Sequence, residues 1–346
     1  MSDNLTGAET ASFRNGAAGI PGMLRRHLPV LLPLLMAVAA WPLVGSPATW
    51  LTLTIAGIAM GMMIFIMASG LTLVFGLMDV LNFGHGAFIS LGAFVGVTVI
   101  SRLGGFEAMP GPLWHIGLAA IAVIVAMIVS GAAGYVFERI LVRGVYGDHL
   151  KQILITMGGL IIVQEGIRAL WGPDEIPVPR PETLRGAIVF GAAAIEKYRL
   201  LVALFGALVF AGLILVLNKT RLGLLIRAGV ENAEMVEALG YHIRKIFIAV
   251  FVAGSALAGL GGVMWGLYQE VVVPELGMQV MVLVFIVVII GGLGSVGGCL
   301  LGGLMVGLLA NYTGYIEPKL ALISNIALMA AILLWRPQGL FPANRL

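Results

Sequence analysis

The polar residues best suited to chemistry in this chain lie together between two long apolar runs. Three of them, Asp79, Asn82 and His85, fall within seven positions of the segment GLMDVLNFGHGAF, and Gly84 and Gly86 flank the histidine. Ionisable groups inside a membrane usually face a cavity or a partner. Glycines let the backbone leave the helical path, and a broken membrane helix with polar groups at the break is a common way to build a solute site. The pattern predicts such a break.

The residues of the break have several interpretations. Asn82, Gly84, His85 and Gly86 are candidates to line a solute path. His85 fits two readings equally: a path-lining side chain, or a neutral histidine hydrogen-bonded at a helix break. Asn82 is a natural N-cap for a helix that begins at residue 84. Asp79 is expected to cap a helix or form an ion pair near the inner membrane surface, and not to bind solute.

Composition places these residues in a polytopic membrane protein. The chain has 346 residues, of which 60% are hydrophobic and 11% charged, whereas soluble domains carry roughly 25% charged residues. The single cysteine, Cys299, excludes an internal disulfide and is expected to be a small buried residue. Since there is no Cys/His cluster and no Walker lysine loop, the sequence predicts no metal site, no ATP hydrolysis by this chain and no nucleic-acid surface.

Apolar runs near the ~20 residues that cross a bilayer predict an all-α fold. Ten such segments occur: 28–45, 51–78, 84–101, 114–138, 152–170, 199–217, 247–267, 279–292, 299–313 and 320–335. Several are short, and we expect one or two to be re-entrant. Residues 1–27 are expected to form a flexible tail and 28–346 a single transmembrane domain. Arg25 and Arg26 before the first run resemble a signal peptide, but three prolines and the spans that follow favour an uncleaved helix.

The basic residues set an orientation. An inside N-terminus places 13 of the 20 Lys and Arg residues on the cytoplasmic side, which is the arrangement that the positive-inside rule favours. The Pro-rich segment 171–198 then lies outside, either as a solvated connector or as a contact for a delivery protein. Glu165 and Arg168 near its start are three residues apart and are expected to form an ion pair.

The polar segment 218–246 then lies inside. Its three glutamates recur every third residue, at Glu231, Glu234 and Glu237, which predicts a short amphipathic helix with Gly240 as C-cap. On this pattern alone the segment is a solvated cytoplasmic helix.

Glycine is abundant and spaced for helix contact. The chain has 48 glycines, and small residues four apart let membrane helices approach closely. The candidates for such packing are Gly254, Ala258, Gly262, Gly294, Gly298 and Gly302. Most are expected to pack within this chain and some against a second membrane subunit.

Four motifs together carry a resemblance that covers about residues 50–341. They are GLTLVFG with NFGHGAF and LGAF, then RAGVENAEMVEALG, then GGLGSVGG, and finally WRPQGLF. In this order they resemble the permease subunits of bacterial branched-chain amino acid ABC importers, and the LivH-type subunit more than its LivM-type sister. The resemblance implies about eight full transmembrane helices plus short or broken re-entrant segments, with the count falling in the pairs 51–101 and 279–313.

The resemblance also implies a function without covalent chemistry. A chain of this kind forms half of a translocation path in the bacterial inner membrane, with both termini cytoplasmic. Its implied partners are a LivM-type sister permease, two ABC ATPase subunits that bind ATP and Mg, an extracytoplasmic solute-binding protein and membrane lipid. By the same resemblance, 218–246 contains the helix that couples to the ATPase. The residues assigned to this coupling are Arg227, Glu231, Glu234, Glu237, Ala238, Leu239 and Gly240.

The solute is left open. Many LivH-type chains have glutamate where this one has Ala87, so a branched-chain amino acid competes with urea, an amide or a carboxylate. A different class remains: a self-sufficient channel or secondary transporter for a small neutral solute such as urea. The segment 218–246 discriminates between them, because a channel has no need of a docking helix. A membrane enzyme is disfavoured, since the sequence shows no paired carboxylates, metal cluster or nucleophile constellation.

Overall fold

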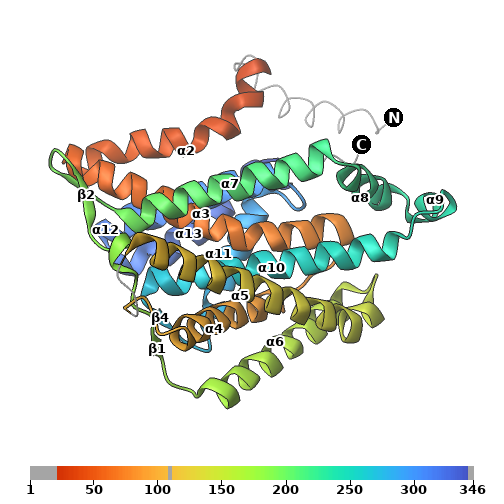
Figure 1. The fold of residues 1–346 in the computed structure, drawn as a ribbon. Helices are drawn as coiled ribbons and strands as arrows, with labels where there is room; N and C mark the ends of the chain where they lie inside the picture. The colour runs from red at the N-terminus through yellow and green to blue at the C-terminus, as the bar shows by residue number, and fades with distance from the viewer. Residues whose placement is uncertain (1–21, 108–110, 342–346) are drawn as a thin grey trace, which may run out of the picture.

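The chain folds as a bundle of long helices that lie roughly side by side (Figure 1). The computed structural model describes residues 22–107 and 111–341. Most of the tail expected at residues 1–27 lies outside these ranges, and the first described helix already begins at Gly22.

Each of the ten apolar segments corresponds to one helix in the described part of the chain. The helices are α2 (Gly22–Val44), α3 (Pro47–Met78), α4 (His85–Arg102), α5 (Pro112–Ile140), α6 (His149–Trp171), α7 (Lys197–Lys219), α10 (Ile243–Gln269), α11 (Leu276–Gly291), α12 (Val296–Ile316) and α13 (Ala321–Trp335). Eight helical stretches are long and apolar enough to cross a membrane, while Leu28–Val44 and α11 are shorter. The predicted all-α membrane fold is confirmed. Short segments were expected in the pairs 51–101 and 279–313. The second pair does contain a short helix, α11, whereas the first contains two helices long enough to span a membrane, α3 and α4.

The bundle has an inner and an outer set of helices. Helices α3, α4, α10, α11 and α12 carry most of the buried residues, and α3 is buried along most of its length. Helices α2 and α6 lie at opposite edges of the bundle (Figure 1). The peripheral helices present large apolar side chains outward, among them Ile162, Leu208 and Leu334. Such faces are expected to contact lipid, where apolar exposure has no cost.

The connections gather at two ends of the bundle, which Figure 1 shows on opposite sides. The α8 end carries the helices α8 (Arg221–Glu231) and α9 (Ala233–Ala238) and the turn η1 (Val142–Val145). The hairpin end carries β2 (Ala187–Phe190) paired with β3 (Ala193–Glu196), and β1 (Ile176–Pro177) paired with β4 (Val271–Val272). The turn η3 (Pro318–Leu320) lies at the same end, and η2 (Glu182–Leu184) lies in the loop before β2. The prediction that 171–198 forms no long helix is confirmed.

The amphipathic helix predicted in 218–246 is two helices, and the prediction of one helix through all three glutamates is wrong. Glu231 ends α8, whereas Glu234 and Glu237 lie on α9. Asn232 separates them because its extended backbone lets its side chain cap α9, accepting a hydrogen bond from the Met235 amide at 2.9 Å. Gly240 follows α9 with φ +87°, a conformation suited to glycine.

Glycines bring the inner helices into backbone contact. A Cβ built on Gly254 of α10 would lie 2.7 Å from the Gly70 carbonyl oxygen of α3, and one on Gly262 would lie 2.0 Å from the Ile89 oxygen of α4. Helix α10 therefore packs closely on both α3 and α4. Ala258 is fully buried between these two glycines.

The glycines of the second glycine-rich region pack in the same way. A Cβ on Gly298 would lie 1.9 Å from the Gly291 oxygen, and one on Gly302 would lie 2.7 Å from the Val287 oxygen, so both close the contact of α12 with α11. Gly294, in the turn between those helices, lies with its Cα 2.1 Å from a Cβ built on Gly76. This turn therefore touches the last part of α3.

Replacing Gly262 by alanine tests the close packing of α10 on α4. The added methyl group would collide with the fixed Ile89 carbonyl, so Gly262→Ala is expected to destabilise the protein by about 1–3 kcal/mol, the usual cost of overpacking. The measurement is the midpoint of thermal unfolding in detergent. Gly158→Ala on α6 is the matched control, because a Cβ there meets nothing within 4 Å; a loss of stability in the control equal to that of Gly262→Ala would contradict the account.

Candidate functional site

The break between α3 and α4 spans residues 79–84 and runs from exposed Asp79 at the α8 end into the bundle, where Val80, Asn82 and Gly84 are buried. Its backbone cannot form helical hydrogen bonds, and an unsatisfied amide away from water is costly. Two side chains of α6 supply the missing acceptors: Gln152 Oε1 accepts from the Leu81 amide at 3.1 Å, and Thr156 Oγ1 accepts from the Phe83 amide at 3.1 Å. Helix α6 thus fixes the path of the broken segment.

Sequence reasoning missed these two residues of α6. Gln152 and Thr156 are both fully buried and stand four apart, so they lie on one face of the helix. A pair of polar side chains at this spacing in an apolar span is the signal that could have found them. It does not say what they bind, because their partners lie about seventy positions earlier in the chain.

The structure corrects the role predicted for Asn82. Helix α4 begins at His85 with Gly84 in the N-cap position, and no side chain caps it. The Asn82 prediction is wrong because a turn at 83–84 separates its side chain from the first helical amides. Only its backbone oxygen contacts the helix start, by accepting from the His85 amide at 3.3 Å. The Asn82 side chain is 1% exposed, and both its polar atoms lack a hydrogen-bond partner among the described residues.

His85 is fully buried at the start of α4. Its Nε2 donates to the Met67 carbonyl oxygen at 2.9 Å, since a carbonyl can only accept. Its Nδ1 has no partner among the described residues. The structure therefore shows a buried histidine hydrogen-bonded at a helix break.

The two glycines beside His85 are packing positions in this conformation. A Cβ on Gly86 would lie 2.9 Å from the Gly277 oxygen of α11, and one on Gly84 would lie 2.4 Å from the Phe137 ring of α5. None of the four predicted path residues lines either of the two cavities described below.

Asp79 stands apart from those four residues. It caps the C-terminus of α3 in a left-handed conformation, with φ 52°. Its Oδ2 lies 3.7 Å from His149 Nε2 at the start of α6, and both side chains are more than half exposed. The expectation that Asp79 caps a helix or pairs is met by the cap of α3 and the contact with His149, whereas its place at the inner membrane surface stays a prediction.

A cleft of about 490 Å³ opens beside Asp79 at the α8 end. Its lining comes from the end of α3, the loop before α6 and the start of α10: Met78, Asp79, Arg143, Tyr146, Gly147, Ile243, Arg244 and Phe247. The Tyr146 hydroxyl donates to Glu138 Oε1 at 2.8 Å. Burial, and then the Glu138 carboxylate, raise the pKa of Tyr146 well above its ordinary value, so the phenol stays protonated as a donor.

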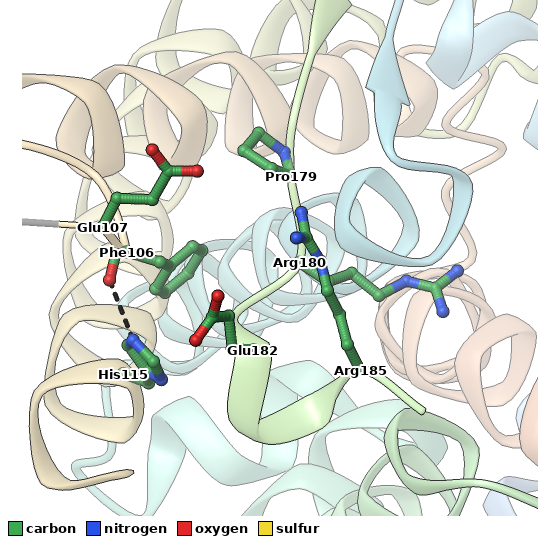
Figure 2. A pocket seen from close by; sticks show the side chains of 7 residues that line it. All are labelled: Phe106, Glu107, His115, Pro179, Arg180, Glu182 and Arg185. Atoms are coloured by element: carbon green, nitrogen blue, oxygen red, sulfur yellow. Dashed lines mark hydrogen bonds between the residues drawn. The ribbon is translucent and has the colours of Figure 1, made fainter. Parts of the chain in front are cut away.

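A smaller pocket of about 150 Å³ lies at the hairpin end. Figure 2 shows Phe106, Glu107 and His115 on one side of it, facing residues of the segment 179–185. His115 Nε2 donates to the Phe106 carbonyl oxygen at 2.8 Å, and its Nδ1 lies 3.2 Å from the Thr183 hydroxyl. His115 thus links the two segments of this pocket.

Arg180, which lines the same pocket, anchors the segment 171–198 to the end of α10. It donates to the carbonyl oxygens of Leu267 and Tyr268, at 2.8 and 2.5 Å. It also forms ion pairs with Glu196 at 3.4 Å and Glu270 at 3.0 Å. This segment is therefore held in place over the bundle.

The far end of α6 is also fixed by side-chain contacts. Arg168 forms ion pairs with Glu165 and with Glu275. The pair with Glu165 confirms the prediction, whereas Glu275, just before α11, was missed because it lies far away in the sequence. The hydrogen bond from Arg168 lowers the pKa of Glu275. Trp171 Nε1 adds a donor bond to Thr98 Oγ1 of α4 at 2.7 Å.

The helices α8 and α9 expose both apolar and charged side chains. Val236 is buried, while Met235 is 60% and Leu239 70% exposed. Arg227 is exposed and donates to Asn218 Oδ1 at 3.2 Å, and Glu234, Glu237, Ala238 and Gly240 are exposed as well. Gly229 of α8 packs on Ile243, at the beginning of α10. These helices therefore join an exposed apolar surface directly to a long inner helix.

The described residues contain no metal-binding cluster: within 22–107 and 111–341, no three His, Cys, Asp or Glu side chains lie close enough to hold an ion. Cys299 is a buried free thiol, as expected.

In the described ranges, ten apolar helices, a broken inner helix and an exposed helix pair at one end define a multi-pass membrane protein. The sequence model of a family described as "Branched-chain amino acid transport system / permease component" matches residues 53–334. The chain belongs to this family of ABC transporter permeases, which are non-catalytic transport subunits. This membership removes the self-sufficient channel from consideration.

Individual proteins with similar sequences are also branched-chain amino acid transport permeases. The chain is 29% identical to the high-affinity branched-chain amino acid transport system permease protein BraD of Pseudomonas aeruginosa, over 82% of this chain and 93% of the relative. It is 26% identical to LivH of Escherichia coli K12, over 82% of this chain and 92% of the relative. It also resembles LivM of the same organism, at 26% identity over 91% of this chain and 75% of the relative. No solved structure matches the chain.

Removing the α6 acceptors tests their role at the break. Thr156→Val and Gln152→Leu each leave a buried amide without a partner, so each is expected to lower the free energy of unfolding by about 1–3 kcal/mol. Thermal unfolding in detergent measures the effect. Thr52→Val is the control, since the Thr52 hydroxyl donates only to the Ala48 oxygen of its own helix; equal losses in all three variants would argue against a special role for α6.

The ion pair of Glu275 predicts a pH dependence. Because the folded-state pKa of Glu275 is lowered from its ordinary value of 4.5, the pair contributes stability above that pH, and this contribution disappears as the pH falls through the folded pKa. The unfolding midpoint of Glu275→Gln should therefore lie below that of the wild type at pH 7, and the gap should close in acid. Glu165→Gln, at the more exposed partner, should have a smaller effect at pH 7. A gap that widens in acid would contradict this assignment.

Proposed function

We propose that this chain forms half of the translocation path of a bacterial ABC importer, with a LivM-type sister permease as the other half. Its solute is a branched-chain amino acid or a related small solute, delivered by an extracytoplasmic binding protein. Two ATPase subunits, which bind ATP and Mg, supply the energy. The relatives BraD and LivH are named for high-affinity branched-chain amino acid transport, and this supports the solute class.

The observation that carries the proposal is the connection between the α8 end and the break. Exposed Met235 lies on the short helix α9, exposed Leu239 is the C-cap residue of that helix, and a brief turn joins them to α10. Helix α10 in turn packs on α3 through Gly254 and on α4 through Gly262, and these two helices flank the break. A partner that moves α9 thus acts on both sides of residues 79–84.

The α8 end is proposed to face the cytoplasm. Nine of the described Lys and Arg residues lie there: Arg139, Arg143, Lys151, Lys219, Arg221, Arg227, Arg244, Lys245 and Arg336. A bacterial permease retains basic residues preferentially on its cytoplasmic side. This orientation supports cytoplasmic N- and C-termini, and it places the hairpin end and its anchored segment 171–198 where a delivery protein arrives.

The break itself is proposed to line the solute path in another conformation. The polar atoms of Asn82 and the Nδ1 of His85 are buried without partners among the described residues. Unpaired buried polar groups are costly, and solute or water at an opened break would satisfy them. The coupling of this opening to the movement of α10 is the proposed transport step.

A charge on the exposed face of α9 tests the ATPase docking. Leu239→Asp is expected to reduce the ATPase that co-purifies with the permease, and to lower uptake at least about tenfold, because a carboxylate replaces an apolar contact in a desolvated interface. Val189→Asp is the matched control for ATPase co-purification alone: Val189 is 67% exposed, close to the 70% of Leu239, but lies on β2 at the hairpin end, away from the proposed ATPase surface. If Leu239→Asp retained full ATPase binding and full uptake, the proposed docking surface would be wrong.

A further inference from the structure

The cleft at the α8 end combines groups of both charges with an apolar wall. Arg143 and Arg244 line it from the loop before α6 and from the start of α10. In the described part of the chain neither guanidinium has a salt-bridge partner. Two such groups in one cleft provide the donors that a carboxylate prefers.

The opposite charge comes from Asp79. Its carboxylate side chain is 72% exposed, and its nearest charged neighbour, His149 Nε2, is 3.7 Å away. The oxygens of Asp79 can therefore accept hydrogen bonds from a primary ammonium group. A cleft that offers both guanidinium groups and a carboxylate is complementary to a zwitterion, and less suited to a simple anion.

The remaining wall is apolar. Met78 and Ile243 are buried and Phe247 is half-buried, and all three line the cleft. Together they can cover a short aliphatic side chain. The volume of about 490 Å³ falls in the range of small-molecule sites.

A buried carboxylate fixes one of the polar side chains of the cleft. Glu138 is 1% exposed, and its Oε1 accepts from Tyr146, which lines the cleft. Glu138 itself does not line the cleft. It holds the Tyr146 hydroxyl in place at the wall.

We propose that this cleft binds a free amino acid with an aliphatic side chain, such as L-leucine, on the α8 side of the membrane. Arg143 and Arg244 bind its carboxylate, Asp79 its ammonium group, and Met78, Ile243 and Phe247 its side chain. Asp79 is the first residue of the break, so solute bound here occupies the end of the proposed path and slows further transport. The inference rests on the proposed transport function and adds to it a site at which the transported solute inhibits further uptake.

Binding to the assembled transporter tests the site directly. The complex of this chain with its sister permease and ATPases is placed in nanodiscs without the solute-binding protein, and binding of labelled L-leucine is measured. Saturable binding is expected, and Arg143→Gln or Arg244→Gln should weaken it at least about tenfold, the effect of losing one charged hydrogen bond. Lys245→Gln is the matched control, because Lys245 is an exposed neighbour of Arg244 that does not line the cleft.

Two probes that resemble leucine test the zwitterion. 4-Methylpentanoate has the carbon skeleton and carboxylate of leucine without the amine, and isopentylamine has the amine without the carboxylate. Both should compete more weakly than leucine. Asp79→Asn should weaken leucine binding and leave 4-methylpentanoate unchanged. The proposal is overturned if no saturable leucine binding is found, if the arginine variants bind like Lys245→Gln, or if 4-methylpentanoate competes as well as leucine.

Uptake into proteoliposomes separates this inference from the transport function. With the binding protein present, empty vesicles test transport alone, whereas vesicles preloaded with L-leucine test the cleft. Preloading should slow uptake by the wild type and by Lys245→Gln, and should slow it less in Arg244→Gln. Transport that is insensitive to preloading overturns the inference and leaves the transport function standing. Leucine binding in the cleft without any uptake into empty vesicles supports the binding site and overturns the transport function.

Discussion

The structure depends on the hydrogen bonds that satisfy the broken backbone between two apolar helices, α3 and α4. Lipid offers no donors or acceptors, so non-helical backbone inside a membrane persists only where protein groups replace the missing bonds. At residues 79–84 the replacement comes from Gln152 and Thr156 of α6, four residues apart on one helix face. At its other end α6 is held by Arg168 and Trp171. The position of the break is therefore set by a peripheral helix that is fixed at both ends.

Helix α10 connects this break to the surface that is proposed to receive the ATPase. It begins shortly after α9, and its glycines leave no space between its backbone and those of α3 and α4. Such contacts transmit displacement because close-packed interiors repack in discrete steps and do not deform continuously. The same geometry explains the abundance of glycine along α10, where a larger residue at Gly254 or Gly262 would collide with backbone. The cleft beside Asp79 is lined by the start of α10 and by the end of α3, where the break begins.

The sequence predicted those features that depend on local pattern. The length of the apolar runs predicted all ten helices. The prolines of 171–198 predicted that this segment forms no long helix, and the three-residue spacing of Glu165 and Arg168 predicted their ion pair. The contacts that the sequence did not predict are those whose partner lies far away in the chain. Neither the acceptors of α6 nor Glu275 can be assigned without knowing which helices are neighbours. Asn82 was misassigned because it lies two residues before Gly84, which takes the N-cap position of α4. The split at Asn232 shows that a cap residue can interrupt a continuous amphipathic pattern.

The central claim is that movement at α9 reaches the break through α10. Hydrogen–deuterium exchange on the complete transporter tests it most directly, by comparing the nucleotide-free state with the state trapped by ATP and vanadate. The account predicts protection of 233–239 in the trapped complex, together with faster exchange of the Leu81 and Phe83 amides as they leave the acceptors on α6. Protection of 233–239 with unchanged exchange across 79–86 would contradict it.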